Sequence, residues 1–380
     1  MMASDSPAEL LSPEGGVLTD PGQVERAIAD IWRLPDDGII GSEAKTATRV
    51  SVGNLIVVGR ADDWHGLSLV LGELSPEYPT RTVVVLLEEP VALQALPATA
   101  PVRASISAIC HAPQPGRLQV CCDQIVLRVA PAAETDLHRT ILPLLESDVP
   151  AVLWWTPAPG SHLLLLKHLR SIADRLVLDA GSLGVLALSP GERAPDKRPP
   201  DRCVVRELGW YRTYRWRQLV AEALDAWATE TLARIDHVAI TVASGLAEDR
   251  IDGLWLAAFL GGQLGWRAGA AGDGGTFRFG WDAGVVKVSM RAANAAGRGL
   301  QSLKLEARGS TLDIQRRAAG GDEYQLIVCD ERTCTLPRSV EVRQLSRAQA
   351  LASAFTGRRV DAAFERAAPL AAWMAGGWRP

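Results

Sequence analysis

The chain lacks the segments that would carry it to or across a membrane. Its 380 residues contain no run of about 18 uninterrupted apolar residues, so no membrane-spanning helix is expected. The first residues, MMASDSPAELLSPEGG, have neither a basic region nor an apolar core, so they do not resemble a secretory signal. We therefore expect a cytoplasmic protein whose six cysteines stand in a reducing compartment.

An excess of positive charge is also absent. The chain has 40 Lys and Arg residues against 44 Asp and Glu residues, a net charge of −4. Proteins that bind nucleic acid carry basic patches, so this balance disfavours a nucleic-acid partner. Nearly half of the residues are apolar, and the length suits two domains rather than one core.

The common catalytic and cofactor motifs are missing as well. No G-x-G-x-x-G follows a strand, and there is no G-x-x-x-x-G-K-[ST], H-E-x-x-H or G-x-S-x-G. The cluster GAAGDGG at residues 269–275 opens no helix, which favours a hairpin loop over a phosphate-binding loop. The six histidines are scattered, and no spacing requires Ser161 and His162 to form a triad with Asp148 or Asp179. We predict no catalytic residue and no cofactor.

The cysteines of interest fall into two groups. Cys110, His111, Cys121 and Cys122 look like metal ligands, but a turn at residues 112–116 would place Cys110 opposite Arg117. At about 3.4 Å per residue, Cys121 would then lie on the order of 13 Å from Cys110, so we predict no metal site and buried thiols instead.

Cys329 and Cys334 flank the loop DERT and are a candidate redox pair. Their separation is compatible with a disulfide, which would be labile or regulatory in a cytosol. Two free thiols are the favoured expectation.

The middle of the chain predicts one crossover of a parallel sheet. Residues 149–155 form an apolar run, Ser161 is a candidate N-cap, and leucines recur at helical spacing after it. Residues 175–179 predict a second buried strand. Trp154 and Trp155 are adjacent, so their side chains point to opposite faces of the first strand.

The first half of the chain alternates strands with helices. Strands are predicted at residues 48–58, 81–87, 102–109 and 118–129, and helices at 20–34, 64–74 and 136–145. This pattern indicates an α/β domain with a largely parallel layered sheet over residues 20–187, after a disordered leader at 1–19. Residues 188–202 are rich in proline and charge and predict a linker.

The second half predicts a smaller α+β domain over residues 203–380. It begins with an aromatic and arginine-rich helix, and most of its remaining segments alternate with period two, which is typical of an antiparallel sheet. The predicted strands are 238–242, 276–281, 284–290, 302–307, 311–315, 324–329 and 334–337. The predicted helices are 249–264 and 347–374.

The opening helix is the most unusual segment. WYRTYRWR places Trp210, Arg212, Trp216 and Arg217 within eight positions. Tryptophan, tyrosine and arginine dominate protein–protein contact sites and form cation–π pairs. The alternative is an interdomain helix whose tryptophans fill a core while its arginines pair with carboxylates.

These segments resemble the OpcA family, the glucose-6-phosphate dehydrogenase assembly proteins. The resemblance rests on DVPAVLWWTPAP, on ADRLVLDAGS and on ELGWYRTYRWRQLVAEALD. The last segment supplies Leu208, Trp210, Arg212, Trp216, Arg217, Ala221 and Asp225. Residues 54–58, 78–86 and 120–129 also match, with Asp123 where the family usually has Glu and Leu224 where it usually has Phe. The likeness runs from about residue 20 to 230 and continues more weakly to the end.

The resemblance implies a non-enzymatic partner of the glucose-6-phosphate dehydrogenase oligomer that favours its assembly and raises its activity in the oxidative pentose phosphate pathway. Our hypothesis is that Trp154 and Trp155, together with Trp210, Arg212, Trp216 and Arg217, form or directly support the docking surface. One alternative is a sugar-phosphate-binding enzyme or sensor that uses strand ends of the α/β domain, with Arg81, Arg175 or Lys167 on the phosphate. Another is a regulator switched by the redox state of Cys329 and Cys334.

Overall fold

The chain folds into two compact units, each with its own sheet. One unit comprises residues 1–178 and 199–206, and the other comprises 179–198 and 207–380. The computed structural model describes residues 16–32, 47–89, 102–111, 119–158, 161–179, 203–243, 247–272, 274–282, 284–293, 298–318, 321–357 and 361–377. The predicted linker at 188–202 and most of the predicted leader therefore lie outside the described residues.

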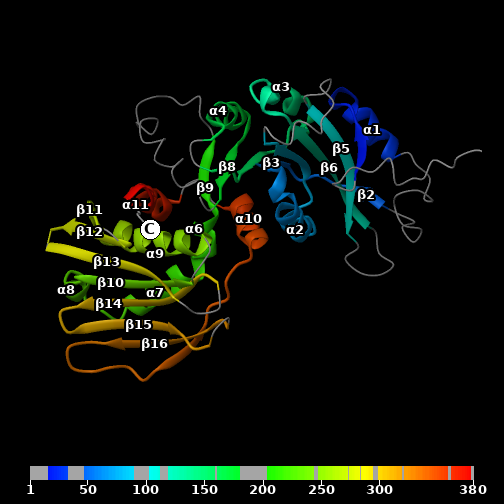
Figure 1. Cartoon of the computed structure of the whole chain (residues 1–380). Helices are drawn as coiled ribbons and strands as arrows, with labels where there is room; N and C mark the ends of the chain where they lie inside the picture. Colours follow the sequence, from blue (N-terminus) through cyan, green and yellow to red (C-terminus); the bar gives the residue numbers. More distant parts are fainter. Residues whose placement is uncertain are drawn as a thin grey trace, which may run out of the picture. The chain divides into compact units, whose positions relative to one another are not determined.

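The first unit is an α/β layer structure (Figure 1). Its sheet has the strand order β1-β5-β6-β4-β3-β7-β8-β9, with β2 paired to β6. The strands are β1 (Val17–Thr19), β2 (Ala47–Arg49), β3 (Asn54–Arg60), β4 (Arg81–Leu87), β5 (Val102–His111), β6 (Gln119–Val129), β7 (Ala151–Trp155), β8 (Arg175–Leu178) and β9 (Val204–Glu207). The helices are α1 (Val24–Ile31), α2 (Trp64–Leu74), α3 (Leu137–Ile141) and α4 (Leu163–Ile172).

The centre of this sheet is parallel, as the sequence predicts. β3 pairs in parallel with β4 and β7, β4 pairs in parallel with β6, and β7 pairs in parallel with β8. The central strands β3, β4 and β7 are buried almost throughout, because α2 and α4 pack on strands of a sheet that is covered on both faces. The edge formed by β1, β5 and β6 is antiparallel.

Several predicted boundaries in this unit are wrong. β1 lies inside the segment predicted as a disordered leader and pairs with β5. The single strand predicted at 48–58 is two strands, because Gly53 lies against the Pro150 carbonyl and β2 turns to pair with β6 instead. The helix predicted at 136–145 ends at Ile141, since Pro143 follows within a short 3₁₀ turn.

The cap of α4 also differs from the prediction. His162, with a positive φ of 54°, is the N-cap residue, and the Ser161 hydroxyl donates to the Ala158 carbonyl.

The second unit places helices on one face of an eight-stranded sheet, mostly antiparallel, of order β11-β12-β13-β10-β14-β15-β16-β17. Its strands are β10 (His237–Ala243), β11 (Arg267–Ala271), β12 (Thr276–Trp281), β13 (Gly284–Ala293), β14 (Leu300–Ala307), β15 (Ser310–Arg316), β16 (Glu323–Cys329) and β17 (Arg338–Glu341). Its helices are α6 (Leu208–Arg212), α7 (Tyr214–Leu224), α8 (Thr229–Leu232), α9 (Ala247–Leu264), α10 (Arg347–Thr356) and α11 (Ala362–Gly377).

The alternation in these strands explains the packing. Phe277, Val288, Ile240 and Leu305 are buried, while their neighbours along the strands are more exposed. Figure 1 shows α9 lying along β10 and β13, and α11 packs on α9. α9 packs closely on the sheet at Gly253, where a Cβ would approach the Met290 side chain to 2.5 Å and the Val242 side chain to 2.9 Å.

Three predictions fail in this unit. The helix predicted at 347–374 is two helices that separate at Gly357, where α10 ends. The strand predicted at 334–337 is only a bridge between Cys329 and Cys334, and the true edge strand is β17. Gly269, predicted within a loop, belongs to β11, which bulges between Ala268 and Ala270.

Candidate functional site

The aromatic and arginine-rich segment begins with a buried carboxylate. Glu207 caps α6: its side chain accepts from the Trp210 backbone NH at 3.3 Å and from the indole NH of Trp255. Glu207 is completely buried. Its cap fixes the start of α6 against α9.

Arg212, at the end of α6, joins a network of buried charges. Its guanidinium lies 2.8 Å from a carboxylate oxygen of Asp252 on α9 and 3.8 Å from Asp179. Arg347, from the first turn of α10, donates to Asp179 at 2.6 Å through Nε. Asp179 and Glu207 are the residues at which the chain enters the second unit, so Arg212 faces both entry points. Glu207 and Asp252 are both buried acids next to Arg212.

Burial and mutual repulsion set the protonation of these groups. Burial raises the pKa of Glu207 to about 8, against the opposing effect of Arg212. Burial raises the pKa of Asp252 to about 6. Burial lowers the pKa of Arg212, but the carboxylates of Asp252, Glu207 and Asp179 outweigh it and raise the pKa above its ordinary value. At neutral pH Glu207 therefore holds a proton while Asp252 is charged.

Trp210 occupies the centre of an aromatic cluster. Its ring centroid lies 5.3 Å from that of Trp255 and 5.5 Å from that of Phe364, and its indole NH donates to Asp361 at 2.9 Å. The guanidinium of Arg217 lies over the same indole, 3.3 Å from the ring centroid. On α7, Trp216 packs edge-on against Tyr324 of β16 at 4.9 Å. The segment thus ties α6, α7, α9 and α11 to the sheet.

Trp154 and Trp155 end the central strand β7 of the first unit. Trp154 stands beside Val57 and Val177 on the neighbouring strands, and Trp155 stands beside Val58 and Leu178. Both side chains are fully buried.

Five of the six residues proposed for docking are buried, and Arg212 is only slightly exposed. The exposed fraction is at most 1% for the four tryptophans and 8–9% for the two arginines. They do not form an exposed patch. Their burial disfavours direct contact with a partner, and the supporting role stays a prediction.

The carboxyl ends of β3 and β7 form the position where open α/β sheets usually bind ligands. There Gly59 lies close to the protein's own side chains: a Cβ would meet Leu67 at 2.6 Å and Thr156 at 3.1 Å. Asp62 and Asp63 occupy the turn that leads into α2, where a dinucleotide's pyrophosphate would sit. Two carboxylates and no glycine-rich turn at this position do not fit a dinucleotide.

The arginines considered for a sugar phosphate lie at the opposite ends of the strands, away from the carboxyl ends. Arg81 and Arg175 begin β4 and β8, so they stand at the amino ends of these strands. Arg81 is buried and bonded at 2.7 Å to Glu25. Lys167 lies within α4. The structure does not bring these three side chains to the carboxyl ends of the strands.

The cysteines differ most from the sequence expectations. Cys110 and Cys121 are paired across β5 and β6 with Cα atoms 4.0 Å apart, and they form a disulfide. The expected separation of about 13 Å is wrong because the connection between the strands is longer than the turn assumed, which shifts the register. Cys122 and Cys203 are not part of a disulfide.

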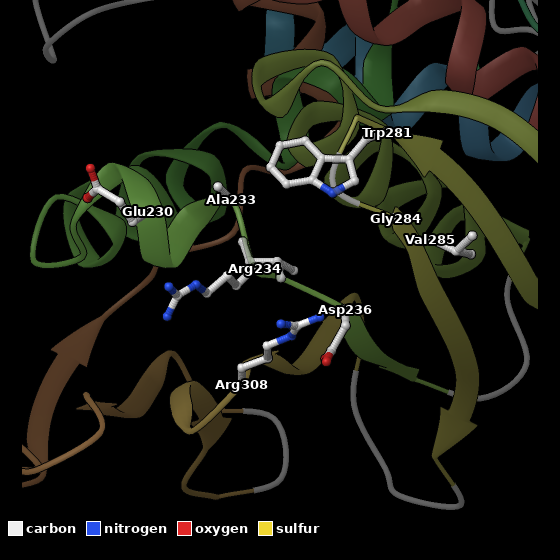
Figure 2. A pocket seen from close by; sticks show the side chains of 9 residues that line it. Glu230, Ala233, Arg234, Asp236, Trp281, Gly284, Val285 and Arg308 are labelled. Atoms are coloured by element: carbon white, nitrogen blue, oxygen red, sulfur yellow. The ribbon is translucent and has the colours of Figure 1, made fainter.

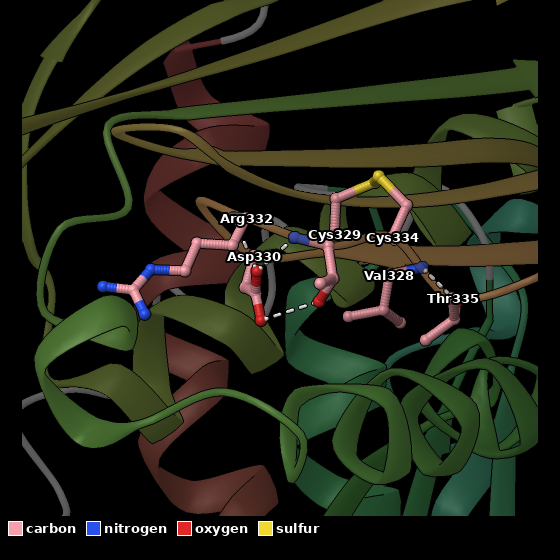
Figure 3. Close-up of a disulfide and its surroundings, with 7 residues drawn as sticks. Val328, Cys329, Asp330, Arg332, Cys334 and Thr335 are labelled. Atoms are coloured by element: carbon pink, nitrogen blue, oxygen red, sulfur yellow. Dashed lines mark hydrogen bonds between the residues drawn. A yellow bond between two sulfur atoms is a disulfide. The ribbon is translucent and has the colours of Figure 1, made fainter.

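Cys329 and Cys334 also form a disulfide, against the favoured expectation of two thiols (Figure 3). The loop between them is held independently by Asp330, whose side chain accepts from the backbone NH groups of Arg332 and Thr333, each at 2.7 Å. Within the part of the chain that the structure describes, no group of three His, Cys, Asp or Glu side chains is placed to hold a metal ion. No helix in that part is long and apolar enough to span a membrane.

Two sequence families match the chain, one for each half. The glucose-6-phosphate dehydrogenase subunit N-terminal domain matches residues 72–187, and the corresponding C-terminal domain matches residues 203–368. The chain belongs to the OpcA family. Each match includes one of the tryptophan-containing segments described above, and the tryptophans of both segments are buried here.

Curated relatives carry the same family name. The "Putative OxPP cycle protein OpcA" of Nostoc punctiforme is 27% identical over 231 residues, which cover 58% of this chain and 47% of that protein. The Synechocystis protein of the same name is 26% identical over 146 residues, covering 38% and 30%. The matched part of this OpcA-family chain thus spans less than half the length of these relatives.

Solved structures also match the chain at low identity. An oxidoreductase from Sinorhizobium meliloti matches with a TM-score of 0.49 and 10% identity, covering 86% of this chain and 96% of that one. The 3-ketoreductase KijD10 of Actinomadura kijaniata matches with a TM-score of 0.47 and 11% identity, covering 86% and 98%. Similarity this distant carries no information about chemistry.

Proposed function

We propose that this chain is a non-catalytic assembly factor that binds the glucose-6-phosphate dehydrogenase oligomer and activates it allosterically. The observation that carries the proposal is the family match, which covers both units under the description of a dehydrogenase subunit. The proposal agrees with a ligand position in the first unit that does not fit a dinucleotide, because an assembly factor needs no cofactor of its own.

The proposed mechanism is a shift of population. A partner raises activity only when it binds the active state of the enzyme more tightly than the inactive state, and the size of the effect is that difference in affinity. A rigid docking surface serves this purpose because little conformational freedom is lost on binding. The buried network of Arg212 and the aromatic cluster around Trp210 supply such rigidity in the second unit.

The test uses the dehydrogenase of the same organism. Each protein and the mixture are run on a sizing column, and the rate of the enzyme is measured in the same fractions. Co-elution with a raised rate is the expected result. Separate elution with an unchanged rate would refute the proposal.

A further inference from the structure

A cavity of about 510 Å³ opens at one end of the second unit's sheet, and none of the six residues of the docking hypothesis lines it (Figure 2). Its side chains combine cations, anions and an indole: Arg234, Arg308, Glu230, Asp236, Trp281 and Val285. Its volume is within the range of small-molecule sites.

Four separate segments converge on this cavity. Arg234 follows α8, and Asp236 immediately precedes β10. Trp281 ends β12 at its turn into β13, and Arg308 lies in the turn between β14 and β15. Backbone hydrogen bonds of the sheet join these segments. The Asp236 NH donates to the Glu306 carbonyl on β14, and the Asp236 carbonyl accepts from the Lys287 NH on β13. The walls are therefore fixed by the sheet itself.

Arg308 is not the residue that its turn favours. Ala307 pairs with Ser310, so Arg308 and Gly309 form a two-residue hairpin turn, with φ values of 38° and 97°. Positive φ at both positions suits Asn, Asp or Gly, and an arginine there stores strain. Strained residues of this kind concentrate at ligand sites.

The two arginines are available to a ligand in different ways. Arg308 is exposed and makes no ion pair with any described residue. Arg234 lies 3.5 Å from Glu331, and both side chains are more than half exposed, so the pair is weak. Glu331 belongs to the loop that the Cys329–Cys334 disulfide closes. An anion bound at Arg234 would displace Glu331.

We propose that this cavity binds a small phosphate monoester with a hydroxylated body. Guanidinium groups bind phosphate through paired charge-assisted hydrogen bonds, which Arg234 and Arg308 would supply. The face of Trp281 suits the flat apolar side of a sugar ring or a base. Glu230 and Asp236 would accept hydrogen bonds from hydroxyl groups. The site is independent of the dehydrogenase, so it goes beyond the function proposed above.

The test is calorimetric titration of the full chain with glucose 6-phosphate, adenosine monophosphate, inorganic phosphate and glucose. At least one of the two esters should bind saturably in the millimolar range or below, roughly tenfold more tightly than inorganic phosphate, and glucose should not bind. Tighter binding of glucose 6-phosphate would indicate that a sugar ring lies on Trp281, and tighter binding of adenosine monophosphate would indicate a base. Absence of saturable binding by both esters, or equal binding of inorganic phosphate, would overturn the proposal.

Arg308→Asn separates binding from folding. Asn relieves the strain of the turn, so the melting temperature should not fall, yet ester affinity should drop at least roughly tenfold. Arg250→Gln, an exposed arginine on α9, is the matched control and should leave affinity unchanged. Glu331→Gln should tighten binding roughly two- to threefold, because a competitor for Arg234 is removed. Wild-type affinity in Arg308→Asn would contradict the assignment.

Discussion

The Arg217 guanidinium lies 3.3 Å from the ring centroid of Trp210 and also donates to the Trp210 carbonyl oxygen at 2.8 Å. One residue thus holds both the side chain and the backbone of another, seven positions earlier. Burial lowers the pKa of Arg217 to about 10, with Asp361 acting in the opposite direction. The charge is held in an apolar place chiefly by the indole face and this carbonyl.

Arg217→Ala should lower the free energy of unfolding by about 3 kcal/mol, because it removes a desolvated cation–π contact and a buried hydrogen bond together. Arg217→Met keeps most of the volume and should cost less. Urea denaturation measures both. The exposed Arg215→Ala, two positions earlier, should change stability by less than about 0.5 kcal/mol. Equal effects at positions 215 and 217 would contradict the structure.

Stability should fall as pH rises towards 8. The pKa of Glu207 is raised from 4.5 to about 8, so the folded chain keeps a proton that the unfolded chain releases in this window. The contribution is complete below about pH 4.5 and is lost as pH passes 8, at up to about 1.4 kcal/mol per pH unit. The pKa of Asp252 is also raised, to about 6, so its protonation likewise stabilises the folded chain below that pH.

Glu207→Gln tests this assignment. Gln keeps an acceptor for the Trp210 and Trp255 NH groups but cannot ionise. Its stability relative to the wild type should therefore increase steadily from pH 5.5 to about pH 8, as measured by urea denaturation across that range. The exposed Glu222→Gln serves as control. Parallel stability curves for wild type and Glu207→Gln would refute the raised pKa.

Trp155→Phe should retain activation of the dehydrogenase, because a fully buried indole cannot touch a partner. Trp155→Ala should instead lose about 3–5 kcal/mol of stability and lose activation only in proportion to the unfolded fraction. Activation titrations paired with circular dichroism distinguish the two effects. A folded Trp155→Phe variant that fails to activate would restore Trp155 to the docking surface.

The disulfides predict a definite number of thiols. The unfolded, unreduced chain should react with two equivalents of a thiol reagent, those of Cys122 and Cys203, and the reduced chain with six. Replacing both Cys329 and Cys334 by Ser should lower stability by about 2 kcal/mol at most, since the loop they close is short. Six reactive thiols without reductant would show that neither bond forms in solution.

The sequence predicts those helices and strands whose residue pattern and end signals lie within the segment itself or directly beside it. The bounds of α2, β4 and β12 agree with the sequence pattern. Ser75 and Pro76 end α2, a continuous apolar run marks β4, and a period-two run marks β12. The parallel pairing of β7 and β8 is predicted from the strand–helix–strand order of this stretch.

Features that depend on distant partners are not predictable in this way. The register of β5 and β6, and with it the Cys110–Cys121 bond, depends on a connection whose length the sequence does not reveal. Glu207 and Asp252 look like surface acids until Arg212 is placed beside them. The tryptophans and arginines of this chain look like a contact surface because contact sites and cores use the same residue types.

The most direct test of the proposed role is the rate of glucose-6-phosphate dehydrogenase as this chain is added at increasing concentration, with the oligomer followed in the same samples by sizing chromatography. We predict a saturable rise in rate that parallels growth of the assembled enzyme and co-elution of this chain with it. A rate and an elution profile that stay constant at every concentration would contradict the assignment of this chain as an assembly factor.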